Sequence, residues 1–113
     1  MNNQEIEVLN TAKEYIERLI AGINEAVQYI QCGNEKLGIE MIPLIGEGIE
    51  YITDILLLLP LEVNSNDIVV NLNSQLEEVV QGLENEDYVL VADILAYEVV
   101  TIIKDIQGIL VKF

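Results

Sequence analysis

The residues of this chain that could do chemistry are almost all carboxylates. The sequence contains 20 Asp and Glu residues, 5 Lys and Arg residues and no His, which gives a formal net charge of −15. Without His, neither a nucleophile–His arrangement nor a Glu-x-x-His metal motif can form. Serine hydroxyls occur only at Ser65 and Ser74, outside any nucleophile-elbow sequence. The sequence therefore predicts a protein that is not an enzyme and uses no cofactor.

The carboxylates are concentrated where the chain has no cation of its own. Residues 37–103, a run of 67 positions, contain 13 Asp and Glu residues and no Lys or Arg. These side chains must stay in water, be buried in the neutral form, or bind a cation or a basic partner from outside the chain. The same charge argues against direct binding to nucleic acid, because the phosphates would be repelled.

Asp93 and Glu98 stand out among these acids because they interrupt an otherwise apolar segment. We expect them to be partly buried, which would favour their neutral form unless Lys13, Lys104 or a partner's cation pairs with them. The first alternative is that both acids are exposed at the edge of the core, with Tyr97 packed beside them. The second is that they form part of a cation or metal site.

A regular row of acids and a regular row of apolar residues run side by side in the second quarter of the chain. Three acids recur every seven residues, namely Glu40, Glu47 and Asp54. Three apolar residues repeat with the same spacing, namely Leu44, Tyr51 and Leu58. The acids form either an ordinary solvated face or a strip that binds Lys and Arg of another protein. The apolar row is either an exposed interface or covered by a second neighbouring helix.

The elements that carry these residues are predicted to be helices, because apolar residues repeat at helical spacing throughout the chain. The first helix covers residues 4–32 and the second covers residues 35–59, with Pro43 inside it and Pro60 ending it. The third runs from the capping residues 64–67 to residue 83, although residues 68–70 also favour a strand. The fourth runs from residue 88 to the C-terminus. Short connections predict an all-α, antiparallel up-down four-helix bundle with residues 1–113 as a single domain.

Three of the four helices have two predicted core rows each. In the first helix they are Ile6, Lys13, Ile20 and Val27 together with Leu9, Ile16, Ile23 and Ile30. In the second they are Ile42, Ile49 and Leu56 together with Ile45, Ile52 and Leu59. In the fourth they are Tyr88, Leu95, Ile102 and Ile109 together with Ala92, Val99, Ile106 and Phe113. The fourth helix is apolar almost all round, so it must lie deep in the bundle or be covered by a second subunit, and we expect a homodimer.

The chain also carries signals of its compartment. The N-terminus has no basic region followed by an apolar block, and the longest apolar run, residues 55–61, is far shorter than the ~20 residues that cross a bilayer. The lone Cys32 cannot form an internal disulfide. We therefore expect a cytoplasmic protein that does not bind membranes.

Residues 87–98 resemble a pattern in a family of small, acidic helical proteins of unknown function from low-GC Gram-positive bacteria. The shared feature is one helix that carries Asp93, Leu95, Tyr97 and Glu98. This resemblance implies a helical fold and no particular activity. In size, acidity and helical content the chain is also similar to bacterial secretion and flagellar export chaperones, which bind helices of their partners.

Taken together, these patterns predict a non-enzymatic protein–protein interaction module, an adaptor or a protein similar to an export chaperone. It would use an apolar helix face with an acidic rim to bind a basic protein or an amphipathic helix. One alternative is a carboxylate-based cation-binding or metal-binding protein. The other is an acidic inhibitor of a basic nucleic-acid-binding protein.

Overall fold

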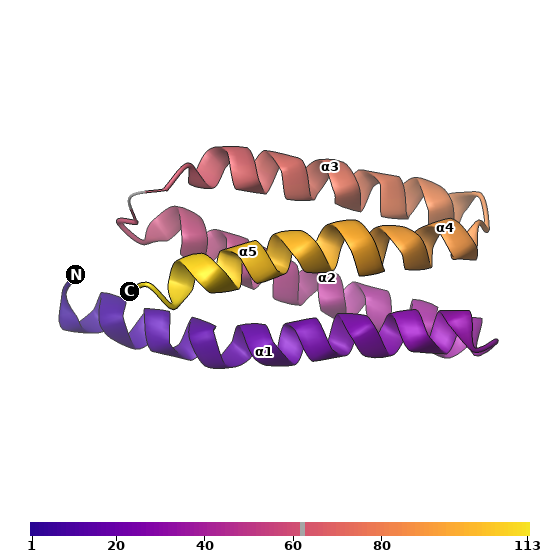
Figure 1. Ribbon diagram of the computed structural model, residues 1–113, viewed down its shortest axis with the longest axis horizontal. Helices are drawn as coiled ribbons and strands as arrows, with labels where there is room; N and C mark the ends of the chain where they lie inside the picture. Colours follow the sequence, from indigo (N-terminus) through magenta and orange to yellow (C-terminus); the bar gives the residue numbers. More distant parts are fainter. Residues whose placement is uncertain (62) are drawn as a thin grey trace.

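The computed structural model describes residues 1–61 and 63–113, and it is an all-α, antiparallel four-helix bundle, as predicted (Figure 1). The first three helices are α1 (Asn3–Gln31), α2 (Glu35–Leu58) and α3 (Ser65–Glu84). The fourth is a continuous helix made of α4 (Tyr88–Asp93), a π-helical segment η1 (Ile94–Val99) and α5 (Val100–Leu110). We call these three segments together the C-terminal helix. The bundle measures 46 × 23 × 18 Å.

The helix ends follow from local chemistry. At the start of α1, the Glu5 N–H donates to Asn2 Oδ1 (2.8 Å) and the Asn2 N–H donates to Glu5 Oε1 (3.0 Å), which completes a capping box. The helix ends at Gln31 with Cys32 as its C-cap, and Gly33 adopts a left-handed conformation with φ 88°. Asn34 precedes α2 but makes no side-chain hydrogen bond to its start.

The core rows of α2 are essentially as predicted, whereas those of α1 differ. On α1, the row of Leu9, Ile16, Ile23 and Ile30 is buried, and so is the predicted companion Val27, but the other buried companions are Ala12, Leu19 and Ala26. The predicted companions Ile6, Lys13 and Ile20 lie at the edge, with Ile6 exposed. The cause is the close approach of α2, since a Cβ on Gly38 would lie 2.7 Å from the Ala26 carbonyl oxygen. Small residues must therefore line this seam.

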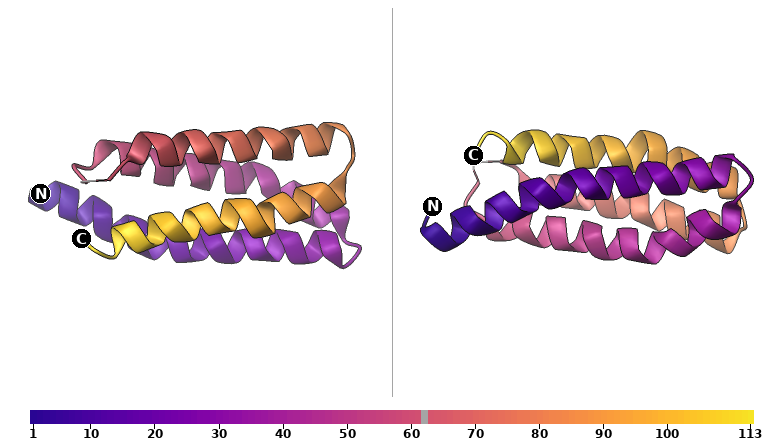
Figure 2. Two further views of the ribbon diagram at one scale, coloured as in Figure 1. Left: turned by 45° about the horizontal axis from the view of Figure 1, so that its top comes forward. Right: turned by 90° about the horizontal axis from the view of Figure 1, so that it is seen from below.

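The C-terminal helix lies between α1 and α3, so the bundle itself covers most of its apolar surface (Figure 2). The predicted core residues Ala92, Leu95, Val99, Ile102 and Ile106 are buried, whereas Tyr88 and Ile109 are only half-buried. Ile103 and Leu110, which lie outside the predicted rows, are also fully buried. In a π turn upstream of them the Val100 N–H donates to the Leu95 carbonyl oxygen, and the extra residue in this turn rotates the following buried face. The predicted core residue Phe113 is exposed, because the helix ends at Leu110.

Candidate functional site

The structure brings six of the predicted site residues together on one side of α2. We call this surface the outer α2 face, and it consists of Glu40, Leu44, Glu47, Tyr51, Asp54 and Leu58. All six are exposed, and the exposed fractions of Leu44 and Leu58 are 69% and 75%. Residues three and four apart are neighbours on a helix, so each apolar residue lies beside a carboxylate. Of the two interpretations of the apolar row, the structure shows the exposed one.

One residue of the outer α2 face is anchored by α1. The rings of Tyr15 and Tyr51 meet edge to face, with centroids 5.1 Å apart and an interplanar angle of 84°. The Arg18 guanidinium carbon lies 5.8 Å from the Tyr15 ring centroid. Gly48 makes this arrangement possible, because a Cβ there would collide with the Tyr15 hydroxyl. The aromatic part of the outer α2 face is therefore held in place by a defined contact.

A small apolar hollow adjoins the outer α2 face. It has a volume of about 170 Å³ and lies between the two helices, where α1 contributes Tyr15, Arg18, Leu19 and Gly22 and α2 contributes Met41, Leu44 and Ile45. The hollow is open enough to receive an apolar side chain of a partner. Gly22 leaves space there, since no atom lies within 4 Å of the position of its absent Cβ.

Asp93, Tyr97 and Glu98 lie on a different part of the surface, on the C-terminal helix. All three are exposed, so the expectation that Asp93 and Glu98 are partly buried was wrong. The reason is geometric, because the C-terminal helix turns its other sides toward α1 and α3. These residues line a hollow of about 340 Å³ with Gln75 and Glu78 of α3, and the structure therefore shows the exposed-acid alternative.

Lys13 does not approach these acids. It is half-buried on the N-terminal half of α1, whereas Asp93 lines a hollow with Ile30 and Gly33 at the opposite end of that helix. Seventeen residues separate Lys13 from Ile30, which corresponds to about 25 Å along an α-helix. Pairing of Lys13 with Asp93, one of the alternatives open at the level of sequence, therefore does not occur.

The described residues offer no metal centre and no membrane span. Within residues 1–61 and 63–113, no group of three or more Cys, Asp or Glu side chains could hold a metal ion. Among the same residues, no helix has the length and apolar character needed to cross a bilayer. Cys32, which follows the last turn of α1, is exposed and free.

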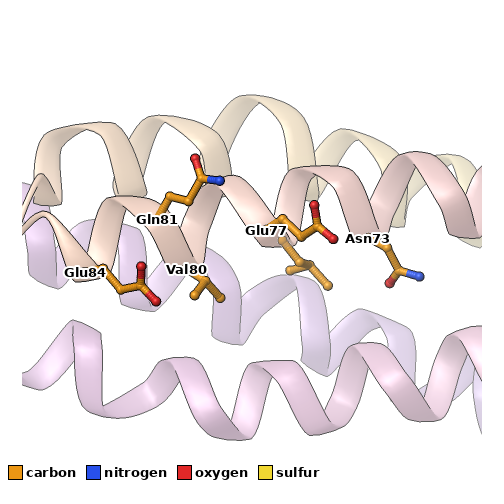
Figure 3. Close-up of a pocket in the computed structure, with 6 residues that line it drawn as sticks. Asn73, Glu77, Val80, Gln81 and Glu84 are labelled. Carbon is orange, nitrogen blue, oxygen red and sulfur yellow. The ribbon is translucent and has the colours of Figure 1, made fainter.

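The structure also contains a groove between α2 and α3, which the sequence patterns did not predict. It consists of two adjoining hollows that share Asn73 and Leu76. One, of about 400 Å³, is lined by both α2 and α3, and the other, of about 590 Å³, continues it along α3 and is lined by α3 residues alone (Figure 3). The groove exists because α2 packs along α1 much more extensively than along α3. The sequence does contain one signal, since Glu77 and Glu84 lie seven residues apart on α3, as do Asn73 and Val80. We call this feature the α2–α3 groove.

The fold and these surfaces define a class of protein, an all-α four-helix bundle that displays apolar side chains beside carboxylates. The chain belongs to the family described as "Domain of unknown function (DUF8042)", whose model matches residues 7–109. This agrees with the expected membership of a family of unknown function. Neither the curated proteins nor the solved structures contain a match to the chain.

Proposed function

We propose that the protein is a non-enzymatic protein–protein interaction module, with the role of an adaptor or a chaperone similar to those of export systems. The observation that supports this function best is the outer α2 face, where Leu44 and Leu58 are exposed directly beside Glu47 and Asp54. Covering one fully exposed Leu contributes about 1.5–3 kcal/mol to binding. The carboxylates would orient a basic partner and accelerate its association.

Other expectations from the sequence remain part of this proposal. A homodimer would use the outer α2 face, because the C-terminal helix is already covered by α1 and α3. The cytoplasmic location, and the origin of the family in low-GC Gram-positive bacteria, also remain predictions. No feature of the described residues favours the two alternatives, a cation-binding protein and an acidic inhibitor of a basic nucleic-acid-binding protein, over this role.

The test uses two matched double variants of the tagged chain in its native cell. Leu44→Gln with Leu58→Gln alters the outer α2 face. Val70→Gln with Val89→Gln is the control, because these valines are equally exposed, at 67% and 75%, but lie on α3 and α4. We expect the first variant to lose captured partners and the second to retain them.

A mass measurement in solution separates a homodimer from a partner of another kind. If the native chain is a dimer, the Leu44→Gln and Leu58→Gln variant should be monomeric and the control variant dimeric. Equal capture of partners by both variants, together with an unchanged mass, would contradict a role of the outer α2 face.

A further inference from the structure

The α2–α3 groove lies beside the outer α2 face and shares only Asp54 with it. Its wall on α2 contains Gly46, Glu50 and Leu57, and its wall on α3 contains Leu76 and Val80. Figure 3 shows Val80, Glu84 and Asn73 of α3 directed toward the space beside the neighbouring helices. The apolar row of the outer α2 face does not line the groove, so the groove can be occupied while that row is free.

An apolar strip runs along the groove beside the polar residues Asn73 and Gln81, and the chain itself covers this strip only in part. Leu76 and Val69 of α3 are half-buried, Val80 is 52% exposed, and Leu57 of α2 is also exposed. Thr53, the one buried polar side chain among the residues that the structure describes, satisfies its hydroxyl locally by donating to the Glu50 carbonyl oxygen at 3.0 Å. An apolar strip in a concave surface is the feature that helix-binding grooves use.

The charged side chains that line the groove are all acidic. Glu50 and Asp54 of α2 line the hollow shared by both helices, and Glu77 and Glu84 line its continuation along α3. Neither wall can supply a cation, because residues 37–103 contain no Lys or Arg. Carboxylates gathered along one groove repel one another, and Lys or Arg from a ligand would relieve this repulsion.

We propose that the α2–α3 groove binds an amphipathic helix of another protein, with an apolar face that covers Leu57, Leu76 and Val80 and with Lys or Arg on its flanks. This inference rests on the proposed function in one respect, because both assign the chain a role in binding another protein. The groove and the outer α2 face are different binding surfaces. From Val69 to Glu84 the groove extends about 22 Å along α3, enough for a helix of about 15 residues.

Neither α2 nor α3 of a second copy of the chain fits this groove. Its net charge is −15, and its few cations lie outside α3 and outside α2 beyond Lys36. Placing α2 or α3 of a second copy in the groove would therefore oppose carboxylates to carboxylates. The charge pattern selects a basic partner.

The test measures binding of a labelled synthetic peptide to the full-length chain by fluorescence anisotropy. The peptide has about 18 residues and forms a helix with Leu on one face and Lys on its flanks. A scrambled peptide of the same composition is the control, because it has the same charge but no apolar face. We expect the amphipathic peptide to bind and the scrambled peptide to bind at least about tenfold more weakly.

The most direct test of the groove is a variant that fills it without removing a contact in the core. A Cβ on Gly46 meets no atom within 4 Å, so Gly46→Phe should fold and place its ring in the groove. We expect it to weaken peptide binding at least about tenfold, since the apolar strip is then occupied. Gly46→Ala is the matched control and should bind as the native chain does. Thermal melting by circular dichroism verifies that both variants are folded.

A second set of variants tests the charges. We expect Glu50→Gln, Glu77→Gln and Glu84→Gln together to weaken binding roughly tenfold at low salt, and this difference should shrink near 0.5 M NaCl. The control neutralises three exposed acids of α1, with Glu14→Gln, Glu17→Gln and Glu25→Gln. The control should reduce binding much less, because these acids lie outside the groove.

The outcomes separate the groove from the outer α2 face. Leu44→Gln with Leu58→Gln should leave peptide binding unchanged. Equal binding of the scrambled peptide, no effect of Gly46→Phe, or a native dimer that Gly46→Phe converts to a monomer would each overturn the groove proposal. In all three cases the capture experiment on the outer α2 face still decides the proposed function independently.

Discussion

Tyr15 of α1 and Tyr51 of α2 form an edge-to-face pair with ring centroids 5.1 Å apart, at the border between the buried α1–α2 seam and the exposed apolar row. The pair connects a packing contact to the candidate binding surface. Tyr51 is the aromatic residue of that surface, so its orientation depends on Tyr15.

The first prediction is that the two tyrosines stabilise the fold cooperatively. In a double-mutant cycle with Tyr15→Leu and Tyr51→Leu, we expect a coupling free energy of about 0.5–1.5 kcal/mol. Either single substitution already removes the edge-to-face contact, so the double variant should lose less stability than the sum of the two single variants. Urea unfolding of the four proteins measures it. Strictly additive losses would show that the rings pack without specific interaction.

The second prediction concerns the glycines of the α1–α2 seam. We expect Gly38→Ala to destabilise the fold by about 1–3 kcal/mol, because the new Cβ would lie 2.7 Å from the Ala26 carbonyl oxygen, which belongs to the backbone and cannot rotate away. Gly48→Ala should cost less, since the tyrosine side chain that it meets can move.

The matched control for both variants is Gly22→Ala. This change adds a Cβ in open space within α1, so we expect it to stabilise the helix by about 0.5–1 kcal/mol. Thermal melting ranks the three variants, and near-ultraviolet circular dichroism should change for Gly48→Ala, because Tyr15 is displaced. A Gly38→Ala variant as stable as Gly22→Ala would show that the helices are farther apart than described.

The third prediction concerns the turn between α3 and α4. Glu86 is a non-glycine residue with a φ of 54°, in the left-handed region that disfavours L side chains. We expect Glu86→Gly to raise the free energy of unfolding by about 0.5–1 kcal/mol, and Glu84→Gly, inside the last turn of α3, to lower it by a similar amount. Chemical denaturation of both variants provides the measurement, and equal effects would contradict the turn geometry.

The fourth prediction follows from the exposure of Asp93 and Glu98. Neutralising them with Asp93→Asn and Glu98→Gln should change the free energy of unfolding by less than about 0.5 kcal/mol per site, as expected for surface positions. Leu95→Ala, between them in the sequence but fully buried, should cost about 2–5 kcal/mol. A large gain in stability on neutralising either acid would indicate that it is buried after all.

Sequence patterns predicted the architecture because the helices are long, clearly periodic and separated by Gly and Pro. They failed on α1, where the buried companion row contains Ala12 and Ala26, because small residues carry little hydrophobic signal and only the approach of α2 makes them core residues. They were wrong in part at the end of the C-terminal helix. The heptad spacing left out Ile103 and Leu110, because it makes no allowance for the extra residue of the η1 turn, and it included Phe113, which lies beyond the end of the helix.

The candidate sites also divide into those that the sequence could predict and those that it could not. The outer α2 face was predictable, because residues spaced by seven on one helix must share a side whatever that helix packs against. The exposure of Asp93 and Glu98 and the existence of the α2–α3 groove depend on how closely separate helices approach. The sequence around Val80 does not show that this residue lines a groove, because the distance between α2 and α3 depends on the packing of the whole bundle.

The sparse contact between α2 and α3 also has a mechanical consequence. Only Leu72, Val79 and Gly82 of α3 are fully buried, whereas α1 buries eight residues. The bundle is therefore a firm three-helix body to which α3 is attached mainly through the C-terminal helix. Tilting α3 is the deformation that costs the least free energy. The width of the α2–α3 groove is thus the dimension of the bundle that changes at the lowest cost in free energy.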